Sequence, residues 1–170
     1  MKANSDMNRE LGKFIDGATV DNLVEAARAA TRRRKNLNLH PELADPIQRL
    51  LNAGEPGTYV RAHRHAPDRW ELIVALRGRI DALFFDDKGV VTERLTLAAG
   101  TGSVLEVAGG QWHSFVFATP GTVALEIKAG PYVAETDKTF AMWAPLESAA
   151  EAASCAAWLE SASIGDRWRA

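Results

Sequence analysis

The chain has 170 residues, of which 46% are hydrophobic and 25% are charged, a composition typical of one soluble globular domain. Its formal net charge of −2 argues against general affinity for nucleic acid. No run of residues approaches the length of a membrane span, and the first ten residues lack the apolar stretch of a signal peptide. A single cysteine, Cys155, cannot form an internal disulfide. These features predict a cytoplasmic protein with no membrane or nucleic-acid partner.

Residues 19–34 have the apolar spacing of an amphipathic helix. Leu23 and Ala27 recur at a helical interval, and Thr19 is a good N-cap residue. The predicted helix ends in four consecutive basic residues at 32–35, which suit the negative end of the helix dipole. Two interpretations of this basic run stay open: a solvated last turn, or an anion-binding site beside a pocket.

Polar and apolar residues alternate directly after the basic run. In an extended segment Asn36, Asn38 and His40 share one face, because successive side chains of a strand point to opposite sides. Two amides and an imidazole in line suit the hydroxyl groups of a polyhydroxylated ligand, so these three are candidate substrate-binding residues. An edge strand with a solvated outer face is the alternative. The next apolar run, residues 47–52, predicts a short helical piece.

Short strands separated by turns dominate the middle of the chain. Gly78 and the turn at residues 86–89 divide runs that are rich in β-branched and aromatic residues. We predict strands at 58–65, 70–77, 79–86, 90–97, 103–107, 113–118 and 122–128. Short strands at this spacing predict an antiparallel sandwich or a small jelly-roll barrel.

A second helix is predicted near the end of the chain. Pro145 suits the first turn of a helix that continues to about Ser161. No internal repeat or low-complexity linker marks a domain boundary. We therefore predict a single domain over residues 1–170, with a helical and extended segment at 1–56, a barrel core at 57–130, and a C-terminal segment and helix at 131–170.

Three of the four histidines have the spacing of a metal site. His63 and His65 are two residues apart, so in a strand they point the same way. Glu71 follows in the next predicted strand, and His113 lies in a third. Neutral imidazoles suit zinc, copper, iron and nickel, and an added carboxylate is compatible with iron or manganese. The four residues are therefore predicted metal ligands.

This arrangement resembles the cupin superfamily. Its first motif is matched by Gly57, His63, His65, Glu71 and Gly78, although five residues rather than three or four separate His65 from Glu71. Its second motif is matched by Gly102, Gly110 and His113, with Ala108 in place of a proline and Phe117 in place of the terminal asparagine. The resemblance implies an all-β core with flanking helices, built as a cupin-type antiparallel β-barrel (jelly roll). It also implies one divalent transition metal, which is Fe, Mn, Zn or Ni.

Longer stretches of the chain look like the WbuC family of cupin-fold metalloproteins, over roughly residues 15–160. The residues that carry this resemblance lie at 32–40, 45–49, 59–65, 85–89, 126–132 and 138–147. The family is associated with bacterial surface-polysaccharide (O-antigen) gene clusters. The resemblance therefore implies a carbohydrate ligand and a role in lipopolysaccharide biosynthesis.

Strand alternation nominates four further pocket residues. Tyr59 and Arg61 share the face of His63 and are candidate substrate-binding residues, with a packing pair at the barrel mouth as the alternative. Glu126 and Lys128 share one face of the last predicted strand and are candidate catalytic residues, with a surface pair as the alternative.

The leading functional hypothesis is a metal-dependent enzyme that acts on a sugar or nucleotide-sugar as an isomerase or epimerase. The alternatives are an iron-dependent dioxygenase and a non-catalytic sugar-binding or regulatory cupin. The predicted strand at 70–77 is apolar on both faces and needs cover on each side. The barrel interior covers one face, and either the N- and C-terminal elements or a second subunit covers the other; we expect a homodimer.

Overall fold

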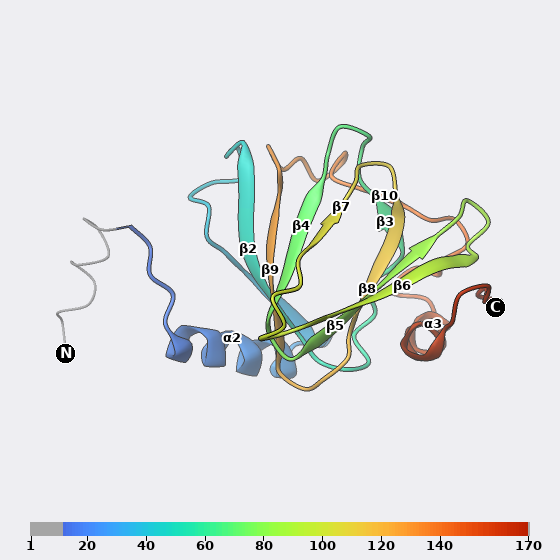
Figure 1. Ribbon diagram of the computed structural model, residues 1–170, viewed down its shortest axis with the longest axis horizontal. Helices are drawn as coiled ribbons and strands as arrows, with labels where there is room; N and C mark the ends of the chain where they lie inside the picture. The colour runs from blue at the N-terminus through green and yellow to red at the C-terminus, as the bar shows by residue number, and fades with distance from the viewer. Residues whose placement is uncertain (1–11, 170) are drawn as a thin grey trace.

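The computed structural model describes residues 12–169; residue 170 and the start of the predicted N-terminal segment, residues 1–11, lie outside it. Two five-stranded antiparallel sheets pack against each other, with one helix on each side (Figure 1). The first sheet has the order β1 (Arg34–Asn38), β2 (Ile47–Gly54), β9 (Thr122–Ala129), β4 (Glu71–Arg77) and β7 (Leu105–Val107). The second has the order β10 (Thr139–Phe140), β3 (His63–Arg64), β8 (Trp112–Phe117), β5 (Arg79–Phe85) and β6 (Val91–Ala98). This is a jelly-roll arrangement.

The two sheets form a sandwich, which is one of the two architectures that the strand spacing predicted, and they do not close into a barrel. Closure requires the edge strands of one sheet to pair with those of the other. Among the described residues no such pairing joins the two sheets, and the edge strands β7 and β10 have only three and two residues. Strands this short leave the sheets hydrogen-bonded only within themselves, and side-chain packing holds the sandwich together.

Three apolar clusters fill the molecule. One lies between the sheets and is built around Ile73, Ile80 and Leu97. A second joins helix α2 (Gly17–Ala29) to the outer face of the first sheet, where Leu23 packs with Val123. The third joins helix α3 (Ala152–Ser161) to the outer face of the second sheet. Each sheet therefore has a helix against its outer face, at opposite sides of the sandwich in Figure 1. Neither described helix is long and apolar enough to cross a membrane.

Several predicted boundaries were wrong. Helix α2 begins at Gly17 because Asp16, not Thr19, is the N-cap: its carboxylate accepts a hydrogen bond of 2.8 Å from the Thr19 amide. The helix ends at Ala29, so the basic run leaves it and enters β1. The predicted strand at 58–65 is reduced to His63–Arg64, and the C-terminal helix begins at Ala152, seven residues after Pro145.

The largest error concerns residues 47–52, which were predicted as a helical piece and form strand β2. This strand pairs along its whole length with β9 on one side and pairs with β1 on the other. Its partners lie far away in sequence, and their hydrogen bonds outweigh the weak local preference of a short apolar run.

Candidate metal centre and pocket

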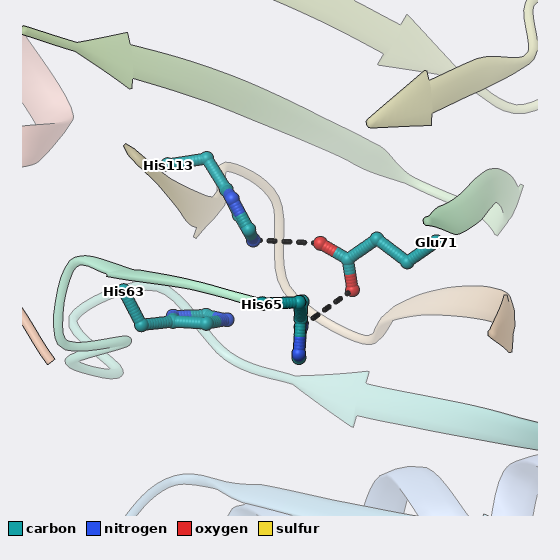
Figure 2. Close-up of side chains that lie close together, drawn as sticks. All are labelled: His63, His65, Glu71 and His113. Atoms are coloured by element: carbon teal, nitrogen blue, oxygen red, sulfur yellow. Dashed lines mark ion pairs between the residues drawn. The ribbon is translucent and has the colours of Figure 1, made fainter. Parts of the chain in front are cut away.

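Four buried side chains converge at one end of the space between the sheets. They are His63, His65, Glu71 and His113, and one ligand atom from each lies within 4.8 Å of those of the others. Figure 2 shows the three imidazoles and the carboxylate turned toward one another. All four predicted ligands are therefore together, including Glu71, despite the longer loop that precedes it. Their binding of a metal stays a prediction.

Strand pairing explains this convergence. His63 of β3 is the direct partner of His113 in β8, so their side chains lie on the same face of the second sheet. Glu71 is the first residue of β4 in the opposite sheet. The loop before Glu71 packs closely on Gly109, where a Cβ atom would lie 2.4 Å from the carbonyl oxygens of residues 66 and 67. A glycine there lets the loop carry its extra residue and still meet the strand of His113.

Backbone carbonyls fix the orientation of all three imidazoles. The Nδ1 atom of His63 lies 2.9 Å from the carbonyl oxygen of residue 61, that of His65 lies 2.6 Å from the carbonyl of Asp137, and that of His113 lies 2.9 Å from the carbonyl of residue 111. A carbonyl only accepts, so Nδ1 carries the proton in each ring. In the neutral rings each Nε2 is then left with a free lone pair, the form in which histidine binds metals.

The contacts of Glu71 suit a bound cation. Its carboxylate oxygens lie 2.6 Å from Nε2 of His113 and 3.5 Å from Nε2 of His65, the two pairs drawn as dashed lines in Figure 2. Yet the Glu71 oxygen and His113 Nε2 are buried, and neither has a partner with hydrogen-bond alignment among the described residues. A lone pair on Nε2 would repel a carboxylate oxygen this close, so the contact requires a positive charge, which is either a proton on His113 or a metal ion. The donor set therefore fits a metal ion.

The charges of Glu71 and His63 suit a metal, whereas at His65 burial lowers the pKa but Glu71 outweighs it and raises that pKa. Burial raises the pKa of Glu71, but His113 and His65 outweigh it and hold that pKa well below its ordinary value. Burial, together with His113, holds the pKa of His63 well below its ordinary value. A carboxylate and a neutral imidazole are the protonation states that coordinate metals.

A pocket of about 870 Å³ is lined by three of these four residues, His63, His65 and Glu71. Its wall includes most of the predicted binding and catalytic residues: Asn36, Asn38, His40, Arg61, Glu126 and Lys128. The volume lies within the range of small-molecule sites. The structure thus brings three of the predicted metal ligands and six predicted pocket residues to one cavity.

Glu126 and Lys128 lie on the pocket side of the first sheet. In the β4–β9 pairing Lys128 is opposite Glu71 and Glu126 is opposite Ile73, so all these side chains share one face. Lys128 Nζ lies 3.0 Å from a carboxylate oxygen of Asp137 and 3.6 Å from one of Glu126. Burial alone lowers the pKa of Lys128, but these two carboxylates raise it, whereas burial and the charge of Glu71 raise the pKa of Glu126.

The N-terminal candidates lie at the edge of the pocket. Asn36 and Asn38 share a face of β1, as the alternation predicted, and their side-chain amides are hydrogen-bonded to each other at 2.8 Å. His40 is buried, and its Nδ1 atom contacts the backbone of Arg49. Its Nε2 atom is buried with no partner among the described residues, although the residue lines the cavity. A buried polar atom in this state is a good candidate for contact with a ligand.

Tyr59 lies outside the pocket lining. Its ring is in the apolar cluster under α3, and its hydroxyl donates to the carbonyl oxygen of Pro145 at 3.0 Å. The predicted alternation does not extend to this residue, because the regular strand begins only at His63. Arg61, in contrast, does reach the pocket wall.

Sequence reasoning missed several residues of the pocket. Gln48 and Asn52 lie on its wall from β2, and Asp137 and Phe140 come from the segment after β9. Gln48, Leu50 and Asn52 stand at every second position, which would place Gln48 and Asn52 on one face of a strand. The prediction of a helix over these residues hid this signal. The segment of Asp137 has no local pattern that would place it beside Lys128.

The comparisons with known proteins agree on the fold. A family model described as a domain of unknown function (DUF6016) matches residues 15–97, and no curated protein matches. CapF with the inhibitor 3-isopropenyl-tropolone is 15% identical, with a TM-score of 0.56 over 65% of this chain and 32% of that chain. This chain therefore corresponds to about a third of the length of CapF.

Two further solved structures are similar. KdgF from Halomonas sp. is 12% identical, with a TM-score of 0.47 over 60% of this chain and 82% of that chain. A Cupin_2 domain of an XRE family transcriptional regulator from Enterobacter cloacae is 17% identical, with a TM-score of 0.44 over 56% and 93%. The likeness to CapF supports the fold described above. Within that fold the chain carries a buried group of three imidazoles and a carboxylate that could hold a metal ion. The finer resemblance to the WbuC family stays a prediction.

Proposed function

We propose that this protein is a metal-dependent enzyme that binds a sugar-class carbonyl compound and moves a proton on it, as an isomerase or epimerase does. The observation that carries the proposal is the position of Glu126 and Lys128, which share a sheet face with Glu71 and line the same pocket. A partly buried carboxylate and an ammonium group beside a candidate metal centre are the parts that such a proton transfer needs.

The protonation states of the two residues suit this role. Because burial and the charge of Glu71 raise the pKa of Glu126, its carboxylate holds a proton more readily than an exposed glutamate does. Lys128 is held in its charged form by Glu126 and Asp137, so it can donate a hydrogen bond to an oxygen that gains negative charge. A metal bound by the four ligands would polarise the carbonyl group.

The sugar class rests on the amides of the wall and on the resemblance to the WbuC family. Asn36, Asn38 and Asn52 line the cavity, and amides offer both a donor and an acceptor to hydroxyl groups. A role in bacterial surface-polysaccharide biosynthesis is part of this proposal and follows from that resemblance alone. The proposed assembly is a homodimer, which light scattering at micromolar concentration tests.

The first test separates metal binding from chemistry. Protein purified without chelators or a nickel column is analysed for bound metal, then loaded in turn with Mn²⁺, Zn²⁺, Ni²⁺ and Fe²⁺. Each form is incubated with aldoses and ketoses in deuterated water, and NMR follows deuterium entering the carbon beside the carbonyl group. Exchange that requires metal supports proton transfer. Oxygen uptake by the iron form without exchange would instead favour the dioxygenase, and sugar binding without either would favour a non-catalytic binding protein.

The second test assigns the acid–base group. Glu126→Gln keeps the shape of the side chain but removes the proton acceptor, so exchange should fall by about 10²–10⁴-fold while bound metal is unchanged. The matched control is Glu106→Gln on β7, a carboxylate of the same sheet that is exposed and does not line the pocket. Equal exchange rates in the two variants would remove Glu126 from the mechanism.

A further inference from the structure

Arg61 is a half-buried cation without a carboxylate partner. Its Nε atom donates to the carbonyl oxygen of Ala144 at 3.0 Å, and Nη2 donates to that of Ala141 at 3.1 Å. None of the ion pairs among residues 12–169 includes it. A guanidinium group has five N–H donors. Its Nη1 atom is therefore left without a protein acceptor in the described part of the chain.

The guanidinium group is held beside the candidate metal centre. It lies 4.9 Å from the ring centroid of Phe140, and that ring lies 6.2 Å from the ring of His63. The carbonyl oxygen of Arg61 also accepts the Nδ1 hydrogen bond of His63. Two carbonyl contacts and an aromatic ring thus fix a cation on the pocket wall, two residues before a predicted metal ligand.

The other cations of the wall differ from Arg61 in being paired or exposed. Lys128 and Lys138 both approach Asp137, and Arg32 and Arg34 both approach Glu147. Lys35 is exposed to solvent. Across the whole lining, six lysine and arginine residues face four aspartate and glutamate residues, and Glu71 is one of those four. The pocket therefore has surplus positive charge before any metal is added.

We propose that Arg61 binds an anionic group, a carboxylate or a phosphate, of the small molecule that occupies the pocket. The planar fork of an arginine matches the paired oxygens of both groups, and a charge-assisted pair is stronger on a partly desolvated wall than in water. This deepens the proposed function, on which it rests for the sugar class of the ligand: the substrate is an acidic or phosphorylated sugar rather than a neutral one.

Small probes test the anion site without knowledge of the substrate. Glycolate, inorganic phosphate and the neutral ethylene glycol are titrated into the full chain at low salt, both loaded with Mn²⁺ and stripped of metal, with calorimetry and thermal melting as readouts. We expect at least one anion to bind both forms and ethylene glycol to bind neither. Binding of glycolate alone identifies a carboxylate site, and binding of phosphate alone identifies a phosphate site.

Arg61→Gln should weaken anion binding by about 10–100-fold, because a charge-assisted pair is lost. The matched control is Arg64→Gln: Arg64 is near in sequence, lies over the ring of Trp112 and does not line the pocket, so the variant should bind anions like the parent. No binding of either anion at millimolar concentration, or equal affinity in Arg61→Gln and the parent, would overturn the proposal.

If Arg61→Gln does not fold, a second measurement on the parent protein still tests the proposal. The Nε–Hε NMR signal of Arg61 is identified as the one missing from Arg61→Lys, and in the parent it should shift on addition of the anion. An unmoved signal overturns the proposal. The titration of metal-free protein distinguishes the anion site from the proposed function. Failure to bind metal would remove the proposed function and leave anion binding intact. Metal-dependent proton exchange on neutral sugars, with no binding of either anion, would instead support the proposed function and remove the anion site.

Discussion

The two ends of the space between the sheets have the same backbone architecture and opposite chemistry. At one end Ile73, Ile80 and Leu97 interlock from strands of both sheets and exclude water. At the other end the same strand β4 presents Glu71, and its neighbour β9 presents Lys128, to an open pocket. Glu71 and Ile73 are two positions apart on β4, with only Leu72 between them. The apolar end stabilises the sandwich, and this stability allows the polar end to keep groups that are costly to bury.

The two ends of the space between the sheets differ in how many polar groups they bury, and this difference has an energetic consequence. Burying an unpaired charge or polar atom costs free energy, whereas burying apolar surface contributes about 25 cal/mol per Å². At the polar end, Glu71 and His113 carry buried atoms without an aligned partner. At the apolar end Ile73, Ile80 and Leu97 are almost completely buried. Substitutions at the two ends should therefore affect different measurements.

The largest effect on folding is expected at the apolar end. Leu97→Ala should lower the free energy of unfolding by about 2–5 kcal/mol, because it leaves a cavity between the sheets at a side chain that is 2% exposed. Chemical denaturation measures this loss. The affinity for metal, measured on the folded variant, should not change. A loss of metal affinity comparable to that of a ligand variant would show that the two ends are not independent.

Leu95→Ala is the matched control for that substitution. Leu95 lies two residues away on the same strand and is 40% exposed, so its truncation should cost less than about 1 kcal/mol. Equal losses in the two variants would contradict the view that the intersheet cluster stabilises this end of the sandwich.

The next effect is expected at the metal centre. His113→Ala should weaken metal binding by at least about 100-fold, or about 2.7 kcal/mol, which is the upper end of the loss seen when residues that merely orient ligands are changed. The measurement is metal content after dialysis, followed by titration of the metal-free protein. In the parent, metal should also raise the melting temperature, and chelation should reverse that rise. A variant that keeps full affinity would remove His113 from the ligand set.

The sequence was informative where local alternation decides the structure. The spacing of His63 and His65 and the position of His113 could be interpreted from strand geometry, and so could most strands of the core. The sequence was uninformative where distant partners decide. Gln48 and Asn52 face the pocket because β2 is paired on both sides, and Asp137 reaches Lys128 from a segment with no regular pattern. A pocket wall built from many segments far apart in the sequence is specified by tertiary pairing, which no single window of sequence contains.

The smallest effect is expected at the rim of the pocket, where the comparison between the two ends is sharpest. His40 is buried like a core residue, yet it lines the cavity, and its Nε2 atom has no partner among the described residues. If that atom contacts the ligand, His40→Ala should weaken binding of the substrate by about 1–3 kcal/mol per lost partner. Metal stoichiometry should stay that of the parent, because His40 is not one of the four converging residues.

Asn38→Ala is the companion variant, because Asn38 lines the same rim from β1 but is exposed and already hydrogen-bonded to Asn36. Its loss of ligand affinity should therefore be smaller than that of His40→Ala. Affinity, metal content and melting temperature measured on both variants decide between three roles for the N-terminal segment. Weaker ligand binding with intact metal content makes the segment part of the site. Unchanged affinity makes it structural cover. Loss of metal from His40→Ala would place that imidazole among the metal ligands. The assignment of His40 to the rim rather than to the metal centre would then be wrong.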